Sequence, residues 1–454
     1  IELWVVFLAG LLSLLLAISA AILVRQELVG STKLGIISKA VLFLAEIPMN
    51  LKTIFQEDKI QEKIQGKDFA LLVKEQRFPN VSGFQGKPLE KETYLLLSRY
   101  DGDAGRSIVE LVDLRSFEVK KTWRPDIDQI NDLVDTSQPE FENLERDKNG
   151  KRYRMTHPFL TEDGGLIFQH VTPLVKIDKN SQLVWQNQED VFHHSIEQDH
   201  EGNFWVPSRL YPYQIDQKYV GLEFGNYHDD AITKVSADGE ILFQKSVSKI
   251  LLEHNMLFPF SGNRKFEQDP IHLNDIQPVL RDGPHWKRGD IFLSLRHQSM
   301  IILYRPSTNK IIWKGVGHTS LQHDVDILDD HRISIFNNNA KVFFDGEKVD
   351  GSNEVVIYDF KTDSYSKYLD ESIEQYDVRT VSSGRSQILD NNDLFIEESN
   401  YGRLLYFNKD AFLQWQYVNR ADDESSWWFN WSRILYKSDD IKKVRKILEI
   451  QDQI

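Results

Sequence analysis

Polar side chains that can carry chemistry recur at the start of short apolar runs between residues 157 and 385. They are His157, His194, Asn274, His323 and Arg385. The chain has thirteen histidines, and several of them fall at this one position. An imidazole with an unperturbed pKa near ~6.5 is a neutral nucleophile that also exchanges protons near neutral pH. The spacing therefore predicts a site built from histidines, provided that the fold brings the starts of these runs together.

Four kinds of site fit such residues. Histidines with an asparagine can hold a small tetrahedral anion and transfer it through one histidine, while Arg296 at the end of FLSLR supplies a fixed charge for the anion oxygens. A metal site is the second kind, but we find no HExxH or carboxylate–histidine pattern at ligand spacing. A quinone cofactor is the third, and no residue gives it positive support. The fourth is a water-filled polar channel in a protein that acts as an interaction scaffold.

A repeated unit indicates how these residues could meet. Each copy is a short apolar run, a turn with Asp, Asn, Gly or Ser, and a second apolar run that ends in an aromatic residue, which is a β-hairpin signature. The copies begin 63, 58, 69, 54 and 49 residues apart, and a unit of that size is typical of propeller blades. The six copies are LVDLRSFEVKKTW (111–123), LVKIDKNSQLVW (174–185), ITKVSADGEILF (232–243), IILYRPSTNKIIW (301–313), VVIYDFKTDSYSKY (355–368) and LLYFNKDAFLQW (404–415).

A second pair of strand-like runs precedes five of the six copies, as in THPFLTEDGGLIFQH (156–170) and QHDVDILDDHRISIFNNN (322–339). The two halves together predict four strands per blade and six blades, hence an all-β, six-bladed propeller. A propeller brings the first strand of every blade to a central funnel, so the polar residues at the starts of these strands should converge there. The longest insertions, 210–230 and 247–273, are rich in Tyr, Phe and Pro and should cover one mouth of the funnel.

The composition excludes several classes of protein. A chain of 454 residues with a formal net charge of −15 and no basic patch is not expected to bind nucleic acid. There is no cysteine, so the protein has neither a disulfide framework nor a thiolate site. Aromatic residues make up 11% of the chain, which suits one large β-rich core rather than several small domains.

The amino end falls outside the repeat. Residues 3–24 contain no charge and would span about 33 Å as a helix, long enough to cross a bilayer. A signal peptide is the alternative, since Ser19, Ala20 and Ala21 resemble a cleavage site. We predict a transmembrane helix at 1–26, an amphipathic helix and charged linker at 27–70, a propeller at 71–437 and a carboxyl-terminal helix at 438–454. The amphipathic part, 33–56, fits a membrane surface or the underside of the propeller equally well.

Five segments of the chain resemble the bacterial arylsulfotransferase family. They are HHSIEQDHEGNFWV, DPIHLNDIQPV, GDIFLSLRHQS, LQHDVDILDDHRISIFNN and GRSQILDNNDLFIEESNYGRLL, which follow one another in order between about residues 157 and 420. The resemblance implies a six-bladed propeller that uses no nucleotide sulfate donor. It further implies ping-pong transfer of a sulfuryl group from an aryl sulfate ester to a phenol through a sulfohistidine.

The resemblance implies a role for each matching residue. His323 of QHD would be the sulfated nucleophile, and His194 of HHSIE would be the acid for the phenolate leaving group. His272 and Asn274 of HLN, together with Arg296, would hold the sulfuryl oxygens. No metal or other cofactor is implied.

Other features of the chain leave the activity open. Tyr211, Tyr213 and Phe258 could stack on the aryl ring, although no motif supports them individually. The membrane helix departs from the soluble periplasmic enzymes of the family. A catalytically silent propeller in a membrane complex, or a homo-oligomer, is therefore the alternative to a membrane-anchored sulfotransferase. In either case we expect the propeller to lie on the periplasmic or extracytoplasmic side.

Overall fold

The computed structural model describes residues 2–28, 71–138, 140–219, 227–261, 267–344 and 346–449. The chain divides into two compact units, 1–66 and 67–454. The amphipathic segment predicted at 33–56 and the linker predicted at 57–68 lie outside the described residues. In the first unit the described element is the helix α1 (Leu3–Leu28).

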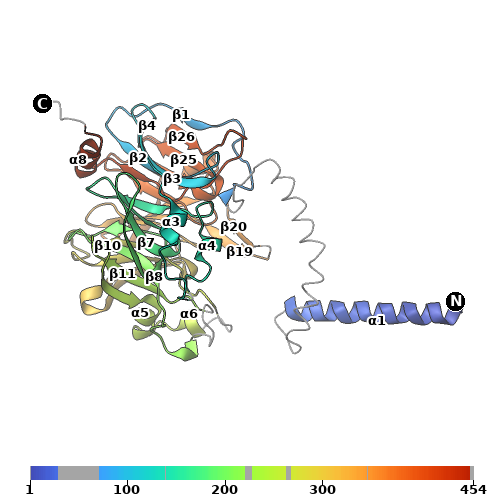
Figure 1. The fold of residues 1–454 in the computed structure, drawn as a ribbon. Coiled ribbons are helices and arrows are strands. Elements are labelled where there is room, and N and C mark those ends of the chain that lie inside the picture. The colour runs from blue at the N-terminus through green and yellow to red at the C-terminus, as the bar shows by residue number, and fades with distance from the viewer. Residues whose placement is uncertain are drawn as a thin grey trace. The chain divides into compact units, whose positions relative to one another are not determined.

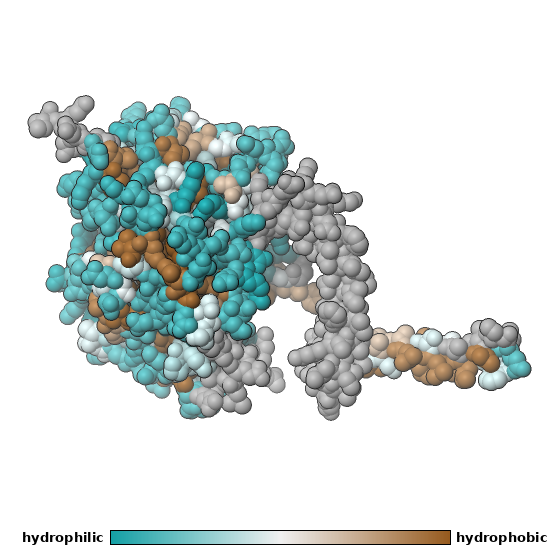
Figure 2. All heavy atoms as spheres, in the orientation of Figure 1, coloured by the Kyte–Doolittle hydropathy of each residue, from teal (hydrophilic) through white to brown (hydrophobic). Residues whose placement is uncertain are grey.

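The helix α1 consists largely of apolar residues, which colour it brown in Figure 2, and side chains such as Phe7 and Leu16 are exposed. Within the described part of the chain, however, no helix combines the length and the apolar character needed to cross a membrane. The transmembrane helix predicted at 1–26 is therefore not supported.

The second unit is mostly β and propeller-like, with antiparallel sheets arranged around a centre (Figure 1). Four separate sheets have the form of blades, and each runs from an inner to an outer strand. They are β27 (Arg433–Leu435), β2 (Tyr94–Asp101), β3 (Arg106–Asp113), β4 (Glu118–Trp123); β13 (Leu273–Pro278), β14 (Ile291–Leu295), β15 (Met300–Arg305), β16 (Lys310–Val316); β17 (Val325–Ile327), β18 (Arg332–Asn337), β21 (Glu354–Asp359), β22 (Ser364–Lys367); and β23 (Arg385–Ile388), β24 (Leu394–Glu398), β25 (Arg403–Phe407), β26 (Leu413–Val418), β1 (Gly83–Gly86).

The second and third predicted blades are not separate, and this corrects the prediction of six blades. Strand β8 is ten residues long, and its end pairs with β10 through Val191 and Phe192. Because of this pairing, the hydrogen bonds run through one eight-stranded sheet. Its strands are β5 (Thr156–Leu160), β6 (Leu166–Gln169), β7 (Thr172–Ile177), β8 (Leu183–Phe192), β10 (Phe204–Arg209), β11 (Asp230–Val235) and β12 (Ile241–Ser246), with β9 (Glu197–Gln198) paired to β10.

The ring of sheets is closed by the carboxyl end of the chain. Strand β27 pairs with β2, with Tyr94 opposite Leu435, and β1 adds a fifth strand to the sheet of β26 (Figure 1). The inner strand of the first blade therefore comes from residues 433–435, far along the sequence from the rest of that blade. This explains why a second pair of strand-like runs precedes only five of the six copies of the repeat.

The apolar core lies between neighbouring sheets. Phe292 and Leu303 on β14 and β15, for example, pack against Ile333 and Tyr358 on β18 and β21. The second strand β14 is buried along its whole length, whereas the outermost strand β16 alternates between exposed and half-buried residues. This graded burial follows the repeat, because only the outer strand needs a polar face.

Short helices and one hairpin that belongs to none of the blade sheets lie outside the blades. The hairpin consists of β19 (Ala340–Phe343) and β20 (Gly346–Val349), and it exposes Val342, Phe343 and Phe344. The helix α8 carries Val444 into the core between the first two sheets. The helices are α3 (Ile127–Asn131), α4 (Leu144–Asp147), α5 (Val247–Glu253), α6 (Phe258–Ser261), α7 (Asp370–Gln375) and α8 (Ser438–Ile447).

Candidate functional site

An unusual backbone conformation precedes the inner strands. L-residues rarely adopt positive φ, and such residues tend to persist where a functional site over-determines them. Here the conformation recurs just before or at the start of successive inner strands. The residues and their φ angles are His157 (45°), His194 (61°), His272 (52°), Leu321 (52°), Ser383 (54°) and Trp431 (67°). The same turn therefore leads into each inner strand, and it places the histidines at one end of the strands.

Three of the predicted site residues gather at this mouth. The ring of His194 lies 5.1 Å from that of His272 and 6.4 Å from that of His323, measured between centroids. Trp431 packs beside them, 5.9 Å from His194 and 6.0 Å from His323. The sequence pattern did not reveal Trp431, because it lies outside the repeat, just before the short closing strand β27.

The protonation of His323 is fixed by its neighbours. The amide nitrogen of Asn338 donates to the carbonyls of Thr380 and Ser383, each at 2.9 Å. The Asn338 oxygen therefore faces His323 and accepts a hydrogen bond from Nδ1 at 2.6 Å. Nε2 then carries the lone pair, which accepts the backbone N–H of Ser383 at 2.9 Å. Burial, together with the nearby charge of Arg296, holds the pKa of His323 well below its usual value.

His194 belongs to a short chain of polar contacts. Its Nδ1 lies 2.8 Å from Nδ1 of His193, whose Nε2 lies 3.3 Å from the Asp230 carboxylate. The Asp230 carboxylate lies nearest to His193 Nε2 and favours a proton on that nitrogen, which makes the Nδ1–H of His194 the donor between the rings and leaves a lone pair on His194 Nε2. Burial and then the positive field of its neighbours hold the pKa of His194 well below its usual value. A neutral His194 is better suited to accept a proton from a phenol than to donate one to a phenolate.

His272 is held by Asp269, which the sequence analysis did not single out. The Nδ1 of His272 donates to the Asp269 carboxylate at 2.5 Å, and His297 Nδ1 donates to the Asp269 carbonyl at 2.6 Å. The signal that could have found Asp269 is the Asp-x-x-His spacing in DPIH. Asp269, His272 and His297 place ligand atoms close enough to hold a metal ion. The contacts above occupy Nδ1 of both imidazoles without one, and metal analysis of the purified protein distinguishes the two cases.

Arg296 is buried beside the histidines but is not free. One guanidinium nitrogen lies 2.9 Å from Nε2 of His297, and the other pairs with the Glu347 carboxylate at 2.5 Å. The Arg296 side chain is 6% exposed and that of Glu347 36%. The Nε of Arg296 is buried without a hydrogen-bond partner. Glu347, on the projecting β19–β20 hairpin, thus takes the place that an anionic ligand of Arg296 would occupy.

The remaining predicted residues are less well placed for an anion. Asn274 is buried, its amide nitrogen donates to the carbonyl of Gln322 at 2.9 Å, and its oxygen has no hydrogen-bond partner. It therefore braces the backbone next to His323 and presents an acceptor rather than a donor. Tyr211 and Tyr213 contact each other, with ring centroids 5.7 Å apart, whereas Phe258 on α6 is 66% exposed.

Buried carboxyl groups follow the histidines along the same inner strands. Asp275 comes directly after Asn274, and Asp324 directly after His323. Burial raises the pKa of Asp275 and of Asp326 to about 8 and that of Asp324 to about 7. Arg385 is the central cation, with one guanidinium nitrogen 2.6 Å from His157 and the other 3.5 Å from Asp324. The contacts of His157 and Arg385 with each other and with Asp324 fit a structural role.

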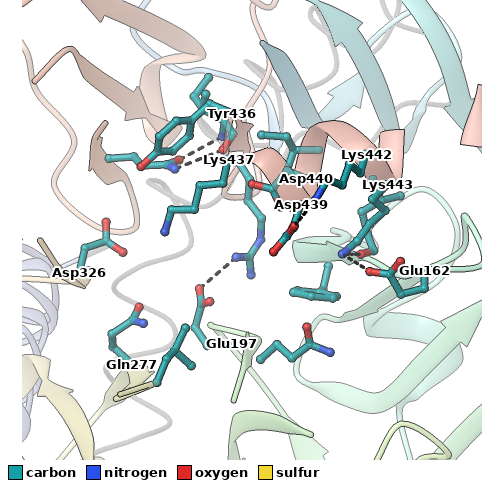
Figure 3. Close-up of a pocket in the computed structure, with 18 of the residues that line it drawn as sticks. Glu162, Glu197, Gln277, Asp326, Tyr436, Lys437, Asp439, Asp440, Lys442 and Lys443 are labelled. Atoms are coloured by element: carbon teal, nitrogen blue, oxygen red, sulfur yellow. Dashed lines mark hydrogen bonds and ion pairs between the residues drawn. The ribbon is translucent and has the colours of Figure 1, made fainter. Parts of the chain in front are cut away.

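A cavity of about 650 Å³ opens at the other end of these strands. Asp326, Gln277 and Glu197 line it, and Lys437 and residues of α8 approach it from the other side (Figure 3). Arg433 reaches across to Glu197 at 3.1 Å. Because an inner strand advances about 3.3 Å per residue, this cavity is separated from the histidines by the length of the strands. We place the candidate chemistry at the histidine mouth, where His323 and Arg296 lie.

Replacing Asp275 by asparagine should show how the buried carboxyl groups of the inner strands make the stability of the fold depend on pH. The folded pKa of Asp275 is about 8, and its unfolded value is about 3.9. The wild-type carboxyl therefore costs nothing below about pH 4 and destabilises the fold progressively as pH rises to about 8. Asp275→Asn, which imitates the protonated form, should gain roughly a few kcal/mol over wild type between pH 5 and pH 8. Urea unfolding at both pH values measures this, and a pH-independent difference would contradict it.

The fold and the cluster together define a propeller-like protein with buried histidines and an arginine at one mouth of its central channel. The chain belongs to the arylsulfotransferase (ASST) family, whose model matches residues 157–420. The family resemblance seen in the sequence is thus confirmed.

The other comparisons are more distant. No curated protein matches the chain. Similar solved structures include a protein of unknown function from Bacteroides caccae, with 11% identity over 72% of this chain and 94% of that one at a TM-score of 0.46. A streptogramin B lyase has 11% identity over 77% and 96% at 0.38. Hydrazine synthase of Kuenenia stuttgartiensis has 11% identity over 71% and 78% at 0.37.

Proposed function

We propose that this protein transfers a sulfuryl group from an aryl sulfate ester to a phenolic acceptor through a sulfohistidine at His323. Membership of the arylsulfotransferase family supports the reaction class. The observation that carries the assignment to His323 is its fixed tautomer. Asn338 holds the proton on Nδ1, which leaves the Nε2 lone pair as the nucleophile.

The first half-reaction involves His323, the backbone N–H of Ser383 and Arg296. Nε2 of His323 attacks the sulfur, so that an N–S bond forms while the bond between sulfur and the aryl oxygen breaks. The hydrogen bond from the Ser383 N–H to Nε2 must open for this step. Arg296 offsets the charge of the sulfuryl oxygens and of the departing phenolate. The phenolate is released or takes a proton from water.

The second half-reaction reverses the first with a new phenol. The acceptor oxygen attacks sulfur, the N–S bond breaks, and the neutral His323 is restored. His194, which is neutral and has its lone pair on Nε2, is placed to take the proton of the acceptor hydroxyl. Water in place of the phenol would give hydrolysis.

A single-turnover experiment tests the proposal. The full chain is mixed with less than one equivalent of 4-nitrophenyl sulfate, and nitrophenol release is followed together with the intact mass. We expect an acid-labile increment of one sulfuryl group on the peptide that contains His323, and its loss when phenol is added. Nitrophenol release without a protein-bound sulfuryl group would argue for direct transfer. No release from a panel of aryl sulfates would favour the silent-subunit alternative.

Glu347 should limit how well the site binds anions. Glu347→Gln removes the carboxylate that occupies Arg296, so inorganic sulfate should bind about three- to tenfold more tightly, a modest change because the pair is partly exposed to solvent. Calorimetric titration of the resting protein measures the change. Asp350→Asn is the matched control, since it removes a charge from the same hairpin where Asp350 pairs with Lys341. Equal gains in both variants would mean that net charge, not Arg296, is responsible.

The location and the protein partners are not part of this proposal. Placement outside the cytoplasm and assembly with membrane proteins stay predictions, to be tested by cell fractionation and by co-purification.

A further inference from the structure

Three basic side chains gather at the histidine mouth, outside the cluster described above. Lys148 follows α4, Arg154 precedes β5, and both touch one imidazole, that of His170. The Lys148 Nζ lies 3.3 Å from His170 Nε2, and the Arg154 Nε lies 3.4 Å from the same atom. Arg154 also lies over the ring of Trp428, 5.5 Å from its centroid. Arg209, at the end of β10, is the third cation, and its charge acts on Lys148.

Two of these half-buried cations, Lys148 and Arg154, lack the carboxylate partners that charges have elsewhere in the protein. Arg305 pairs with Asp290 at 2.6 Å and Arg99 with Glu110 at 2.8 Å. In the described part of the chain, by contrast, no carboxylate forms an ion pair with Lys148 or Arg154. Burial, and for Lys148 then the charges of Arg154 and Arg209, lowers the pKa of Lys148 to about 8 and that of Arg154 to about 10. A partly buried charge without a paired carboxylate is costly, so Lys148 and Arg154, with Arg209 beside them, favour an anion from outside the chain.

Arg209 connects this group to the proposed site. Arg209 is paired with Val191 on β8. Val191 lies two residues before His193 and three before His194. The Arg209 Nε is buried without a hydrogen-bond partner and lies 3.7 Å from the Asp230 carboxylate, which is too far for a good hydrogen bond. Arg209 also contributes to the lowered pKa of His194. Arg209 therefore connects the three cations with the histidine cluster through its effect on His194.

We propose that Lys148, Arg154 and Arg209 form a second anion subsite, which binds a carboxylate or second sulfate group carried by the aryl sulfate substrate. The inference rests on the proposed function, because it takes the histidine cluster as the place where the transferable sulfate lies. It narrows the substrate class from simple aryl sulfates to aryl sulfates with two anionic groups. Arg296 would then hold the reacting sulfate, and the cationic subsite the other end of the molecule.

Binding of sulfonates tests the subsite apart from the chemistry, since their carbon–sulfur bond cannot be transferred. We compare benzenesulfonate with 4-carboxybenzenesulfonate and 1,3-benzenedisulfonate by calorimetry on the full chain. Wild type should bind at least one of the two dianions about tenfold more tightly than the monoanion. Lys148→Met combined with Arg154→Met should lose this preference while its affinity for benzenesulfonate stays within about twofold. Lys151→Met, at an exposed lysine three residues from Lys148, is the matched control and should keep the preference.

The melting temperature of the double variant shows whether it is folded. Because the double variant removes two half-buried charges that have no paired carboxylate, its melting temperature without ligand should equal or exceed that of wild type. If the double variant fails to fold, the same comparison is made with Lys148→Met alone. The subsite is wrong if wild type shows no preference for either dianion, or if the double variant keeps it. Failure of sulfuryl transfer would appear instead as an absent label on His323. The anion subsite and the transfer reaction can therefore be disproved independently of each other.

Discussion

Replacing His323 by alanine should lower the rate of aryl sulfate turnover by at least about 10³-fold, because the nucleophile that forms the covalent intermediate is lost. The sulfuryl label should disappear with the activity. His318→Ala is the matched control, since His318 is exposed and stacks on Tyr365, with ring centroids 3.7 Å apart, away from the cluster. Steady-state assays and intact-mass measurements on both variants check this. Turnover by His323→Ala at the wild-type rate would remove His323 from the mechanism.

The pH dependence of the first half-reaction offers an independent test of the same residue. Burial and the charge of Arg296 lower the pKa of His323, so its lone pair stays available as the pH falls below the ordinary range of histidine. The rate of nitrophenol release in a single turnover should therefore remain level through about pH 6.5 and decline only at lower pH. Asn338→Leu removes the acceptor that holds the Nδ1 proton, and it should lower this rate without weakening the binding of sulfate.

The repeat pattern predicted the parts of the fold that depend on short-range periodicity. It located the hairpins and the polar starts of the inner strands, and it placed His194 and His323 at one mouth, whereas His272 came from the family resemblance. It could not predict that β8 continues into a pairing with β10, because hydrogen bonds between successive blades leave no mark on apolar spacing. The closing strand β27 was missed for a similar reason. It lies more than three hundred residues from its partner β2, and three residues are too few to show a period.

The residues that tune the site were also beyond the sequence pattern. Asn338 and Asp269 set the tautomers of His323 and His272 from a loop after β18 and from the segment before β13. Their roles depend on contacts made in three dimensions, not on any fixed spacing from the histidines. The family motifs named the reacting groups, whereas the groups that orient them had to be read from the structure.

Replacing Arg296 tests whether the site is catalytic or only structural. After His323→Ala, this replacement should cause the second largest loss of aryl sulfate turnover. Arg296→Met should reduce aryl sulfate turnover by about 10²–10³-fold, as expected for loss of a fixed donor to the developing charge. Arg296→Lys should recover only part of the rate, because an ammonium cannot replace a planar guanidinium that reaches two partners.

The alternative is that Arg296 serves only to pair with Glu347. Two observations argue against a purely structural pair. Arg296 is far more buried than Glu347, and its buried Nε–H has no acceptor. A purely structural pair would lose stability but not turnover per folded molecule when Arg296 is replaced, and Glu347→Gln would cause a similar loss of stability. A catalytic Arg296 predicts opposite effects on sulfate binding, which Arg296→Met weakens and Glu347→Gln strengthens. Measuring sulfate affinity and melting temperature on both variants therefore decides between an arginine that holds the hairpin and one that holds the substrate.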